Sequence, residues 1–421
     1  MLFGRTHRVL PGELVLCQCL SYEEQVRDDP VAVVLGDLDL VSSLGLAGIR
    51  SVPVAAPRSP VRFSRFSKTG IDTCASNDED ALIDRLVRFA AGLENTPVLF
   101  YQSDSDLLLV SRRRADLQPS FSYVVPSAEM VEDLVDKGRF RALMEKSGIL
   151  VPRSCVLPVD NERERTFELR FPVVVKATTR SGLTRLAYSG KAVQIDTMSE
   201  LREVCTQAAH EGVELIAQEM VPGPETAIES YHAYIDEHGD IVADFTGRKV
   251  RTQPRTFGYS TAVCTTQSPD LMSAGRSLVA TIGLRGVIKA DYKRDPAGHL
   301  YLLEVNPRFS LWNHLGAAAG VNLPALVYAD LTAGVRPQIT SARAGLTWCQ
   351  MGGDRRTAAE AGISMAQWLR WLVRTSARAE GRWSDPMPLL RGVALAKVRS
   401  LGGHGGAASP TAEAGSRVRS Q

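Results

Sequence analysis

The sequence predicts an α/β protein, with an N-terminal doubly wound parallel sheet followed by a part built of helices and antiparallel hairpins. Two observations predict this fold class. Over residues 1–125, short apolar runs typical of strands alternate with helical runs, the order found when helices connect parallel strands. Farther along, strand-like runs flank short turns such as Glu237–Asp240 and Asp295–Gly298, which favours hairpins.

The composition is that of a globular protein with more than one core. At 421 residues the chain exceeds an ordinary single domain. Its hydrophobic fraction of 44% gives enough apolar material to bury, and a charged fraction of 23% with little net charge does not favour disorder. A formal charge of +2 provides no general attraction for nucleic acid or an anionic membrane. We therefore expect neither nucleic acid nor a membrane as a partner, and the composition does not decide whether the protein forms a homodimer.

No segment has the roughly 20 apolar residues that a membrane helix needs, and the N-terminus lacks the pattern of a secretory signal. We expect a cytoplasmic protein. Seven cysteines lack the paired C-x-x-C spacing of zinc or redox motifs. Cys17 and Cys19 alternate within the apolar run Leu14–Leu20, and buried thiols in a strand are the prediction there.

The N-terminal elements follow in order along the chain. The expected strands are Val31–Leu35, Ser51–Val54 and Pro97–Tyr101, and the expected helices are one opening at Asp39–Gly45 and one over Asp78–Leu93, capped by Asn77 or Asp78. Ligands of such sheets lie beyond the carboxyl ends of the strands, where Gly36–Asp37 and Gln102–Asp104 fall. Turn chemistry and helix capping explain these polar residues equally simply.

The later elements are less regular. Those that we expect are a helix over Ala128–Ser147, a strand Phe171–Lys176, a polar loop Ala177–Gly190, a helix Ser199–Glu211, a strand Glu214–Gln218, paired strands Ala227–Tyr234 and Ile241–Phe245, a hairpin of Gly286–Lys293 with Leu300–Val305, helical structure over Gly316–Gly334, and a helix Met365–Val373. The tail from Gly402 to Gln421 has almost no bulky apolar residue, which predicts disorder.

The second hairpin carries a group of oxygen ligands. Glu304 and Asn306 are two apart on one strand, so both point to the same face. Asp291 ends the preceding strand and can lie opposite them. Hairpin strands often expose single acids, but Leu302 and Val305 make this strand largely apolar, and an unpaired cluster of acids there would repel itself. The pattern predicts a magnesium site.

Two lysines form a second group. Lys176 follows the apolar run Phe171–Val175 at the end of a strand, so its stem would be buried and its charge presented beyond the strand. Arg180, Ser181 and Gly182 lie in the loop after it, which could close over phosphates. Lys137, considered alone, is more simply a solvated helix residue.

The third candidate segment is the turn Gln218–Glu225. A strand that ends in Pro222–Pro224 leaves backbone amide and carbonyl groups available for the edge of a purine. Alone, the Pro-Gly-Pro sequence indicates only a turn.

In this order the motifs resemble the ATP-grasp superfamily over about residues 1–335, most closely the carboxylate–amine ligases that include D-aspartate ligases. The resemblance implies a domain preceding the grasp fold (1–125) and a two-subdomain ATP-grasp domain (126–335), with a lid over about 150–220 and a metal-binding subdomain over about 221–335. A C-terminal helical extension (336–401) and the tail (402–421) would follow.

The resemblance also implies how the nucleotide is held, with ATP and Mg²⁺ as cofactors and Mn²⁺ as the alternative metal. Lys137 and Lys176 match the lysines that reach the phosphates. The Glu219 carbonyl and the Val221 amide match the purine contacts. The full set of implied ATP contacts is Lys137, Lys176, Gln218, Glu219, Val221 and Glu225, the last as the acid that binds ribose.

The implied catalytic residues lie on the hairpin. Asp291, Glu304 and Asn306 match the metal ligands, Lys289 a residue that neutralises charge on the transferring phosphoryl group, and Arg308 the arginine that faces the acceptor carboxylate or acyl phosphate.

A further phosphate contact falls on Lys249, with Arg248 as a close competitor. The loop after Lys176 lacks the several glycines of many relatives, which leaves its contacts with ATP open. His314 could act as a base for the amine, although a packed helix-start histidine explains it as well, and Asp104 could contact the substrate.

The implied reaction is phosphoryl transfer from ATP to a carboxylate, then attack of an amine on the acyl phosphate to form an amide, ADP and phosphate. An ATP-dependent carboxylase, a small-molecule kinase and a non-catalytic nucleotide-binding regulator are the alternatives. The partners are small-molecule carboxylate and amine substrates, whose identity the sequence does not encode.

Overall fold

The computed structural model describes residues 29–73, 78–157, 168–178, 183, 186, 188 and 192–393. Several predictions fall outside these residues: the Leu14–Leu20 strand with its two cysteines, Asn77, most of the loop after Lys176 and the C-terminal tail.

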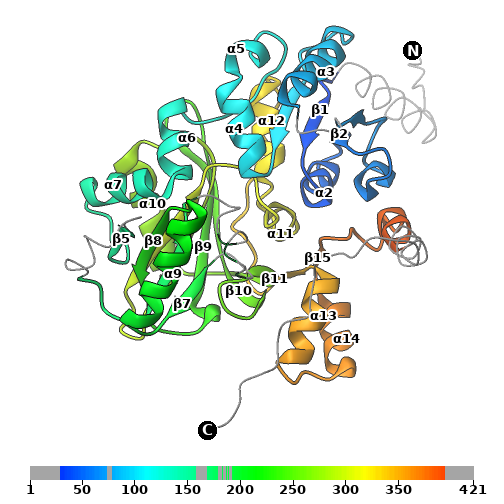
Figure 1. Cartoon of the computed structure of the whole chain (residues 1–421). Coiled ribbons are helices and arrows are strands. Elements are labelled where there is room, and N and C mark those ends of the chain that lie inside the picture. Colours follow the sequence, from blue (N-terminus) through cyan, green and yellow to red (C-terminus); the bar gives the residue numbers. More distant parts are fainter. Residues whose placement is uncertain are drawn as a thin grey trace, which may run out of the picture.

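The N-terminal part is the predicted doubly wound parallel sheet (Figure 1). Its four strands have the order β3-β2-β1-β4, and all neighbouring pairs are parallel. The elements are β1 (Ala32–Leu35), α2 (Leu38–Leu46), β2 (Ser51–Ala55), η1 (Pro60–Phe63), β3 (Ile71–Asp72), α3 (Glu79–Ala91), β4 (Val98–Tyr101), α4 (Asp104–Arg112) and α5 (Arg114–Leu117). All four β1 side chains are buried, since helices cover both sheet faces.

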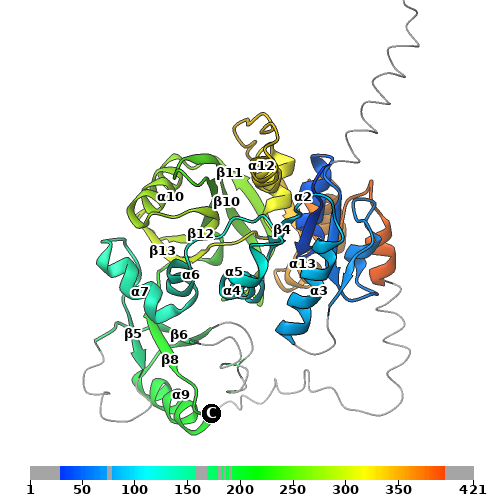
Figure 2. The same cartoon turned by 90° about the horizontal axis from the view of Figure 1, so that it is seen from above.

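A second four-stranded sheet follows, which is antiparallel and has the strand order β5-β8-β6-β7. We call it the smaller sheet, because the antiparallel sheet described below has seven strands. It consists of β5 (Ser154–Leu157), β6 (Val173–Ala177), β7 (Val193–Ile195) and β8 (Leu215–Glu219), and α9 (Met198–Glu211) packs on it. In Figure 2 this sheet and α9 lie apart from the N-terminal sheet.

The helix predicted over Ala128–Ser147 is interrupted. It forms α6 (Ala128–Val135) and α7 (Lys137–Lys146). Asp136 between them has an extended ψ of 125°, and its carboxylate accepts a hydrogen bond from the Arg139 amide. The side chain thus caps α7 and starts a second helix where a continuous one was expected.

The largest sheet has seven strands in the order β13-β12-β9-β10-β11-β14-β15. Its elements are η3 (Glu225–Ala227), β9 (Ile228–Ile235), β10 (Ile241–Gln253), β11 (Tyr259–Thr266), α10 (Pro269–Ile282), β12 (Gly286–Arg294), β13 (Leu300–Asn306), β14 (Thr347–Cys349) and β15 (Ala377–Arg378). Both predicted hairpins are present, and β10 runs past Phe245 to Gln253. Helix α10 packs on one face of this sheet through apolar side chains.

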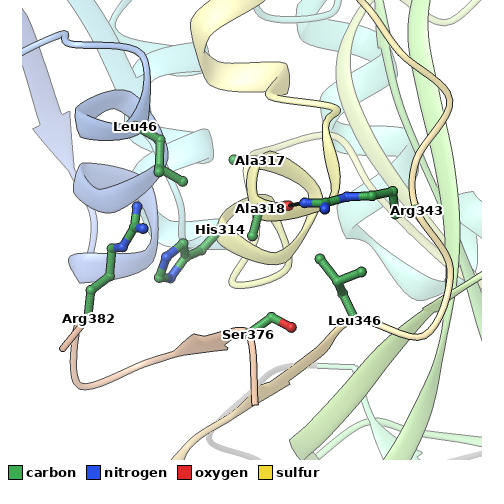
Figure 3. Close-up of a pocket in the computed structure, with 8 residues that line it drawn as sticks. All are labelled: Leu46, His314, Ala317, Ala318, Arg343, Leu346, Ser376 and Arg382. Atoms are coloured by element: carbon green, nitrogen blue, oxygen red, sulfur yellow. Dashed lines mark hydrogen bonds between the residues drawn. The ribbon is translucent and has the colours of Figure 1, made fainter. Parts of the chain in front are cut away.

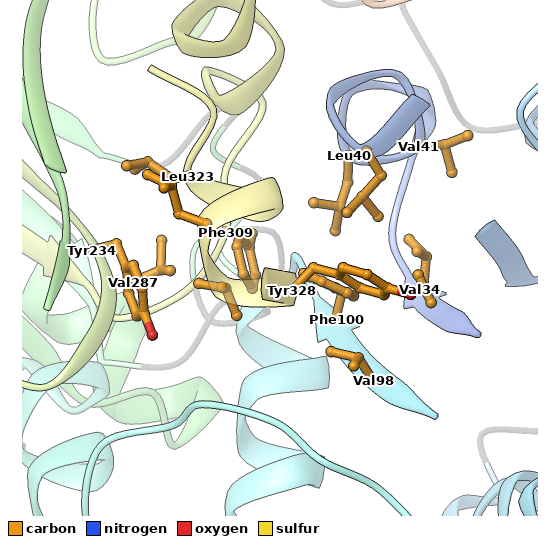
Figure 4. Close-up of a cluster of buried hydrophobic side chains, with 14 of the residues drawn as sticks. Val34, Leu40, Val41, Val98, Phe100, Tyr234, Val287, Phe309, Leu323 and Tyr328 are labelled. Atoms are coloured by element: carbon orange, nitrogen blue, oxygen red, sulfur yellow. The ribbon is translucent and has the colours of Figure 1, made fainter. Parts of the chain in front are cut away.

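The segment expected to be helical over Gly316–Gly334 forms α11 (Asn313–Ala319) and α12 (Leu323–Leu331). The break is Gly320, which has a φ of +107° and on which a Cβ would lie 2.6 Å from Thr340 Oγ1. These helices lie between the N-terminal sheet and the seven-stranded sheet. Figure 4 shows Phe309 and Tyr328 between Val34 of the N-terminal sheet and Tyr234 of the seven-stranded sheet.

Beyond residue 335 the chain returns to the largest sheet. β14 pairs with β11, and β15 pairs with β14 in parallel, strands that the sequence did not predict. The helix expected at Met365–Val373 is confirmed as α14 (Met365–Arg374), next to α13 (Met351–Glu360). Both Arg251 of β10 and Trp368 of α14 donate hydrogen bonds to the buried Asp354 of α13. None of the described helices is both long and apolar enough for a bilayer.

Candidate functional site

The predicted metal ligands lie on one face of the seven-stranded sheet. Asp291 of β12 is directly opposite Glu304 of β13, and Lys289 is opposite Asn306. Opposed residues of an antiparallel pair share a face. We call this side face A, and the opposite side, which α10 covers, face B.

Hydrogen bonds from neighbouring side chains stabilise the charged carboxylates of this group. Ser230 Oγ and Lys289 Nζ each donate to the carboxylate of Asp291, which is 4% exposed. Asn306 Nδ2 donates to Glu304 Oε1 at 3.1 Å, and Glu304 itself is exposed. Adjacent cationic and amide groups satisfy both carboxylates, so neither acid is left uncompensated.

These residues fit a magnesium ion by their chemistry. Two carboxylates and an amide oxygen on one sheet face are the hard donors that Mg²⁺ takes, and the exposed Glu304 leaves room for phosphate oxygens and water. Within the described ranges, no three His, Cys, Asp or Glu side chains cluster as a metal site. Asp291 and Glu304 would therefore share the ion with Asn306 and with ligand oxygens.

Strand alternation separates Lys249 from Arg248. Gly247 is opposite Ser230 across the β9–β10 pair, so Lys249, two residues on, also lies on face A. The charges of Asp291, Lys289, Glu304 and Glu225 all influence the pKa of Lys249, but burial is the largest effect and lowers this pKa below 10.5. Arg248 lies on face B opposite Glu229. Of these two residues, Lys249 is the one that lies beside the predicted metal ligands.

Lys293 is a face-A residue that the sequence reasoning missed. It follows Lys289 and Asp291 at the same spacing of two along β12, a signal that could have found it. Its side chain is buried, and burial lowers its pKa, which Lys249 lowers further and Glu225 raises. Lys249, Lys289 and Lys293 therefore surround the acids with positive charge.

The other end of face A is covered by apolar groups. His232, opposite Lys289, stacks on Phe245 with ring centroids 4.4 Å apart and lies 5.1 Å from the Trp312 ring. A Cβ on Gly247 would lie 2.6 Å from the Trp312 ring, so only glycine permits this approach. His232 Nε2 is buried without a hydrogen bond, and burial holds its pKa well below 6.5. Sequence reasoning missed this neutral histidine.

The two other predicted phosphate lysines converge on the smaller sheet. Lys176 Nζ of β6 donates to Gln218 Oε1 of β8 at 2.8 Å. Lys137 Nζ, from the first turn of α7, donates to the carbonyl of Ala177, the residue after Lys176. The structure therefore places the Lys137 side chain at the end of β6. The sequence around Lys137, considered alone, had favoured a solvated helix residue.

The segment predicted to hold adenine ends β8. The Glu219 side chain accepts hydrogen bonds from the Arg170 amide at 3.0 Å and from Arg170 Nη2 at 3.2 Å. Burial would raise the pKa of Glu219, but these bonds hold it below the ordinary value. Val221 is buried, and Gly223 turns the chain with a φ of +109° toward Glu225 in η3.

Arg308 links face A to the N-terminal sheet. Its Nε pairs with Asp104 at the start of α4, one Nη donates to the carbonyls of Gln102 (3.0 Å) and Phe309 (3.3 Å), and the other donates to Asn306 Oδ1 at 3.1 Å. Four of its five N–H groups are thus engaged. A bidentate pair with a substrate carboxylate would require displacement of Asp104 or Asn306.

The polar residues after the strands of the N-terminal sheet form turn hydrogen bonds and cap helices, the two local roles considered for them. Ser103 caps α4 in a capping box with Asp106. The Asp37 amide donates to Gln102 Oε1 at 2.6 Å, and burial raises the pKa of Asp37, as do the charges of Asp39 and Asp106. Local hydrogen bonding explains these residues, while Asp104 makes the contact with Arg308.

His314 lies elsewhere. It is buried in α11, and its Nδ1 is 3.4 Å from Asp39 Oδ1 of α2. No described contact joins it to the acids or lysines of face A.

Residues 211–352 match a family model described as "ATP-grasp in the biosynthetic pathway with Ter operon". The D-aspartate ligase of Enterococcus faecium (strain Aus0004) is 21% identical over 288 residues, which cover 65% of this chain and 68% of that protein. A D-alanine–D-alanine ligase of Pseudomonas putida (strain GB-1) is 23% identical over 220 residues, which cover 48% of this chain and 64% of that protein.

Solved structures share the fold. The crystal structure of an L-amino acid ligase from Bacillus licheniformis superposes with a TM-score of 0.58 and 13% identity, covering 76% of this chain and 78% of that one. The biotin carboxylase domain of the Hydrogenobacter thermophilus 2-oxoglutarate carboxylase, solved with MgADP and bicarbonate, has a TM-score of 0.57 and 14% identity, covering 75% and 73%. The matched residues 211–352 include all of face A described above, and with this shared fold they identify that part of the chain as an ATP-grasp domain.

Proposed function

We propose that this protein is an ATP-dependent carboxylate–amine ligase, which activates a carboxylate as an acyl phosphate and couples it to an amine. The observation that carries the proposal is face A. It places Lys249, Lys289 and Lys293 around Asp291 and Glu304, a charge pattern suited to a polyphosphate with a divalent metal.

ATP would lie between the smaller sheet and face A. Lys137 and Lys176 would contact its phosphates, the backbone of Glu219 and Val221 its adenine, and Glu225 its ribose. The proposal is supported by the convergence of both lysines at the end of β6. Each of these side chains now has an internal partner, which the nucleotide would replace.

Asp291, Glu304 and Asn306 would hold Mg²⁺, or Mn²⁺ in its place, and the bound ion would neutralise charge on the phosphates. Lys249 and Lys289 would add positive charge beside the γ-phosphate. A carboxylate oxygen of the substrate would attack the γ-phosphorus, and the bond from that phosphorus to the bridging oxygen would break, leaving ADP and an acyl phosphate. Catalysis here would consist of positioning and charge neutralisation.

The second step forms the amide. The amine nitrogen would attack the acyl carbon, inorganic phosphate would leave, and the nitrogen would lose a proton to solvent or to the departing phosphate. Arg308 would position the acyl group with its remaining N–H, held in place by Asp104 and Asn306. The names of the relatives, D-aspartate ligase and L-amino acid ligase, support amino acids as the substrate class.

The test is ADP release by the purified protein with ATP and Mg²⁺, across a matrix of carboxylic acids and amines. For a ligase, release should require one acid together with one amine. Hydroxylamine in place of the amine should trap the acyl phosphate as a hydroxamate. The Glu304→Gln variant is the control for contaminating ATPases, because it removes one carboxylate of the metal site.

Carboxylation through carboxyphosphate is the second candidate, since a structural neighbour is a biotin carboxylase domain solved with bicarbonate. ADP release that requires bicarbonate and no other acid would favour this reaction over ligation. ADP release with an acceptor alone would indicate a kinase. No ADP release with any combination, while ATP still binds, would favour a regulatory protein.

A further inference from the structure

A cavity lies outside face A, where three parts of the chain meet. It has a volume of about 420 Å³. Helix α2 contributes Leu46, α11 contributes His314, Ala317 and Ala318, and the C-terminal part contributes the rest. Its lining residues are Leu46, His314, Ala317, Ala318, Arg343, Leu346, Ser376 and Arg382 (Figure 3). The residues proposed to bind ATP or metal are absent from this lining.

The charged groups of this lining have one sign. Two arginines line the cavity and none of the eight residues is an acid. Arg382 is half-buried, and its guanidinium has no hydrogen bond or ion pair to any described residue. One Nη of Arg343 donates a hydrogen bond to the Ala318 carbonyl at 2.8 Å. The unpartnered guanidinium of Arg382 is available to an oxyanion, for which its planar shape is well suited.

His314 is a buried wall of the cavity. Its side chain is 1% exposed, and its Nδ1 faces the buried carboxylate of Asp39, with Oδ1 3.4 Å away. The same Oδ1 accepts a hydrogen bond from Trp348 Nε1 at 2.6 Å. In Figure 3 the His314 ring and the Arg382 side chain lie on the α2 side, with Arg343 and Leu346 opposite.

The other walls are apolar. Leu46, Ala317, Ala318 and Leu346 provide alkyl surface between the polar groups. The volume falls in the range of about 300–1,000 Å³ that is usual for small-molecule sites. We propose that this cavity binds a small organic anion, with a carboxylate or phosphate group against Arg382 and a short apolar body against the alanines and leucines.

This inference goes beyond the proposed ligase activity, and it can be tested by titration calorimetry without ATP. The probes are n-hexanoate, acetate, inorganic phosphate and, as a cation of the same length, n-hexylamine. We expect hexanoate to bind at one site, acetate to bind more weakly because it lacks the body, and hexylamine not to bind. Binding of phosphate in place of hexanoate would identify the preferred head group as phosphate.

Matched variants locate the binding. Arg382→Gln should weaken hexanoate binding by about tenfold or more, because a charged hydrogen bond is lost. Arg374→Gln is the control, since this exposed arginine of α14 lies outside the lining. Ala317→Leu should exclude hexanoate by filling the space for its body while retaining phosphate. Circular dichroism and thermal unfolding check that each variant is folded.

The outcomes separate this site from face A. Lys249→Gln should bind hexanoate as the unaltered protein does, whether or not that protein is a ligase. Hexanoate binding that disappears in Lys249→Gln and persists in Arg382→Gln would overturn the proposal, because the anion would then occupy face A. Absence of binding by both hexanoate and phosphate would also overturn it.

Discussion

The two faces of the seven-stranded sheet use the same strands for different purposes. On face B, charged side chains of the sheet form ion pairs with side chains of α10 and of the neighbouring strand. Arg294 pairs with Glu229 and with Asp270 of α10, and Arg276 of α10 pairs with Asp244 at 2.7 Å. On face A, burial lowers the pKa of two lysines that lie close to acids. The comparison teaches that these face-B pairs are complete within the protein, while face A gathers buried lysines around its acids, a concentration of charge that a polyanion with a metal would offset.

The largest expected effect is that of Glu304→Gln. Loss of one carboxylate of the proposed metal site should lower the turnover of ATP by at least about a hundred-fold. The side chain is exposed, so the melting temperature should stay nearly unchanged. ADP release and calorimetric unfolding measure the two. Turnover at the unaltered rate would contradict the assignment of face A.

Neighbouring residues of β10 provide the most direct comparison of the faces. Lys249→Gln should lower kcat/KM for ATP by about a hundred-fold, the effect of removing one preorganised group that stabilises transition-state charge. Arg248→Gln, one residue away on face B, should change it by less than about twofold, since exposed ionic contacts contribute little. Steady-state kinetics at saturating Mg²⁺ measure both, and equal losses in the two variants would refute the division between faces.

A smaller effect is expected at the ribose position. Glu225→Gln should raise KM for ATP by about tenfold, the equivalent of one charged hydrogen bond, and leave kcat within about twofold. The charge of Glu225 also raises the pKa values of Lys249 and Lys293. A fall in kcat with unchanged KM would instead give this acid a role in the transition state.

The smallest effect should lie on face B and depend on pH. Hydrogen bonds from Arg294 lower the pKa of Asp270 from 3.8 to about 2. A lowered pKa stabilises the fold fully above pH 3.8, and this contribution is lost as the pH falls toward 2. The carboxylate is largely exposed, so the gain is below about 1 kcal/mol.

Urea unfolding of Asp270→Asn and the unaltered protein at pH 7 and pH 3 measures this contribution. The difference in unfolding free energy should be largest at pH 7 and shrink at pH 3. A difference that grows on acidification would contradict the sign.

Much of the fold could be predicted because its signals are local. Apolar runs and turn residues indicated the parallel sheet and both hairpins, and the spacing of two between Glu304 and Asn306 placed them on one face. Breaks at Asp136 and Gly320 were missed, because a side-chain cap at Asp136 and the positive φ of Gly320 interrupt otherwise helical segments.

The sequence by itself determined which residue types follow one another on each strand, and so the order of lysines and acids along the hairpin. Tertiary structure alone decided that Lys249, not Arg248, lies beside Asp291, and that Ser230 and His232 join them. It also paired Arg308 with Asp104, 204 positions away, and returned β14 to β11. Alternation along a strand is local, whereas strand register and the face that a helix covers depend on packing between distant segments.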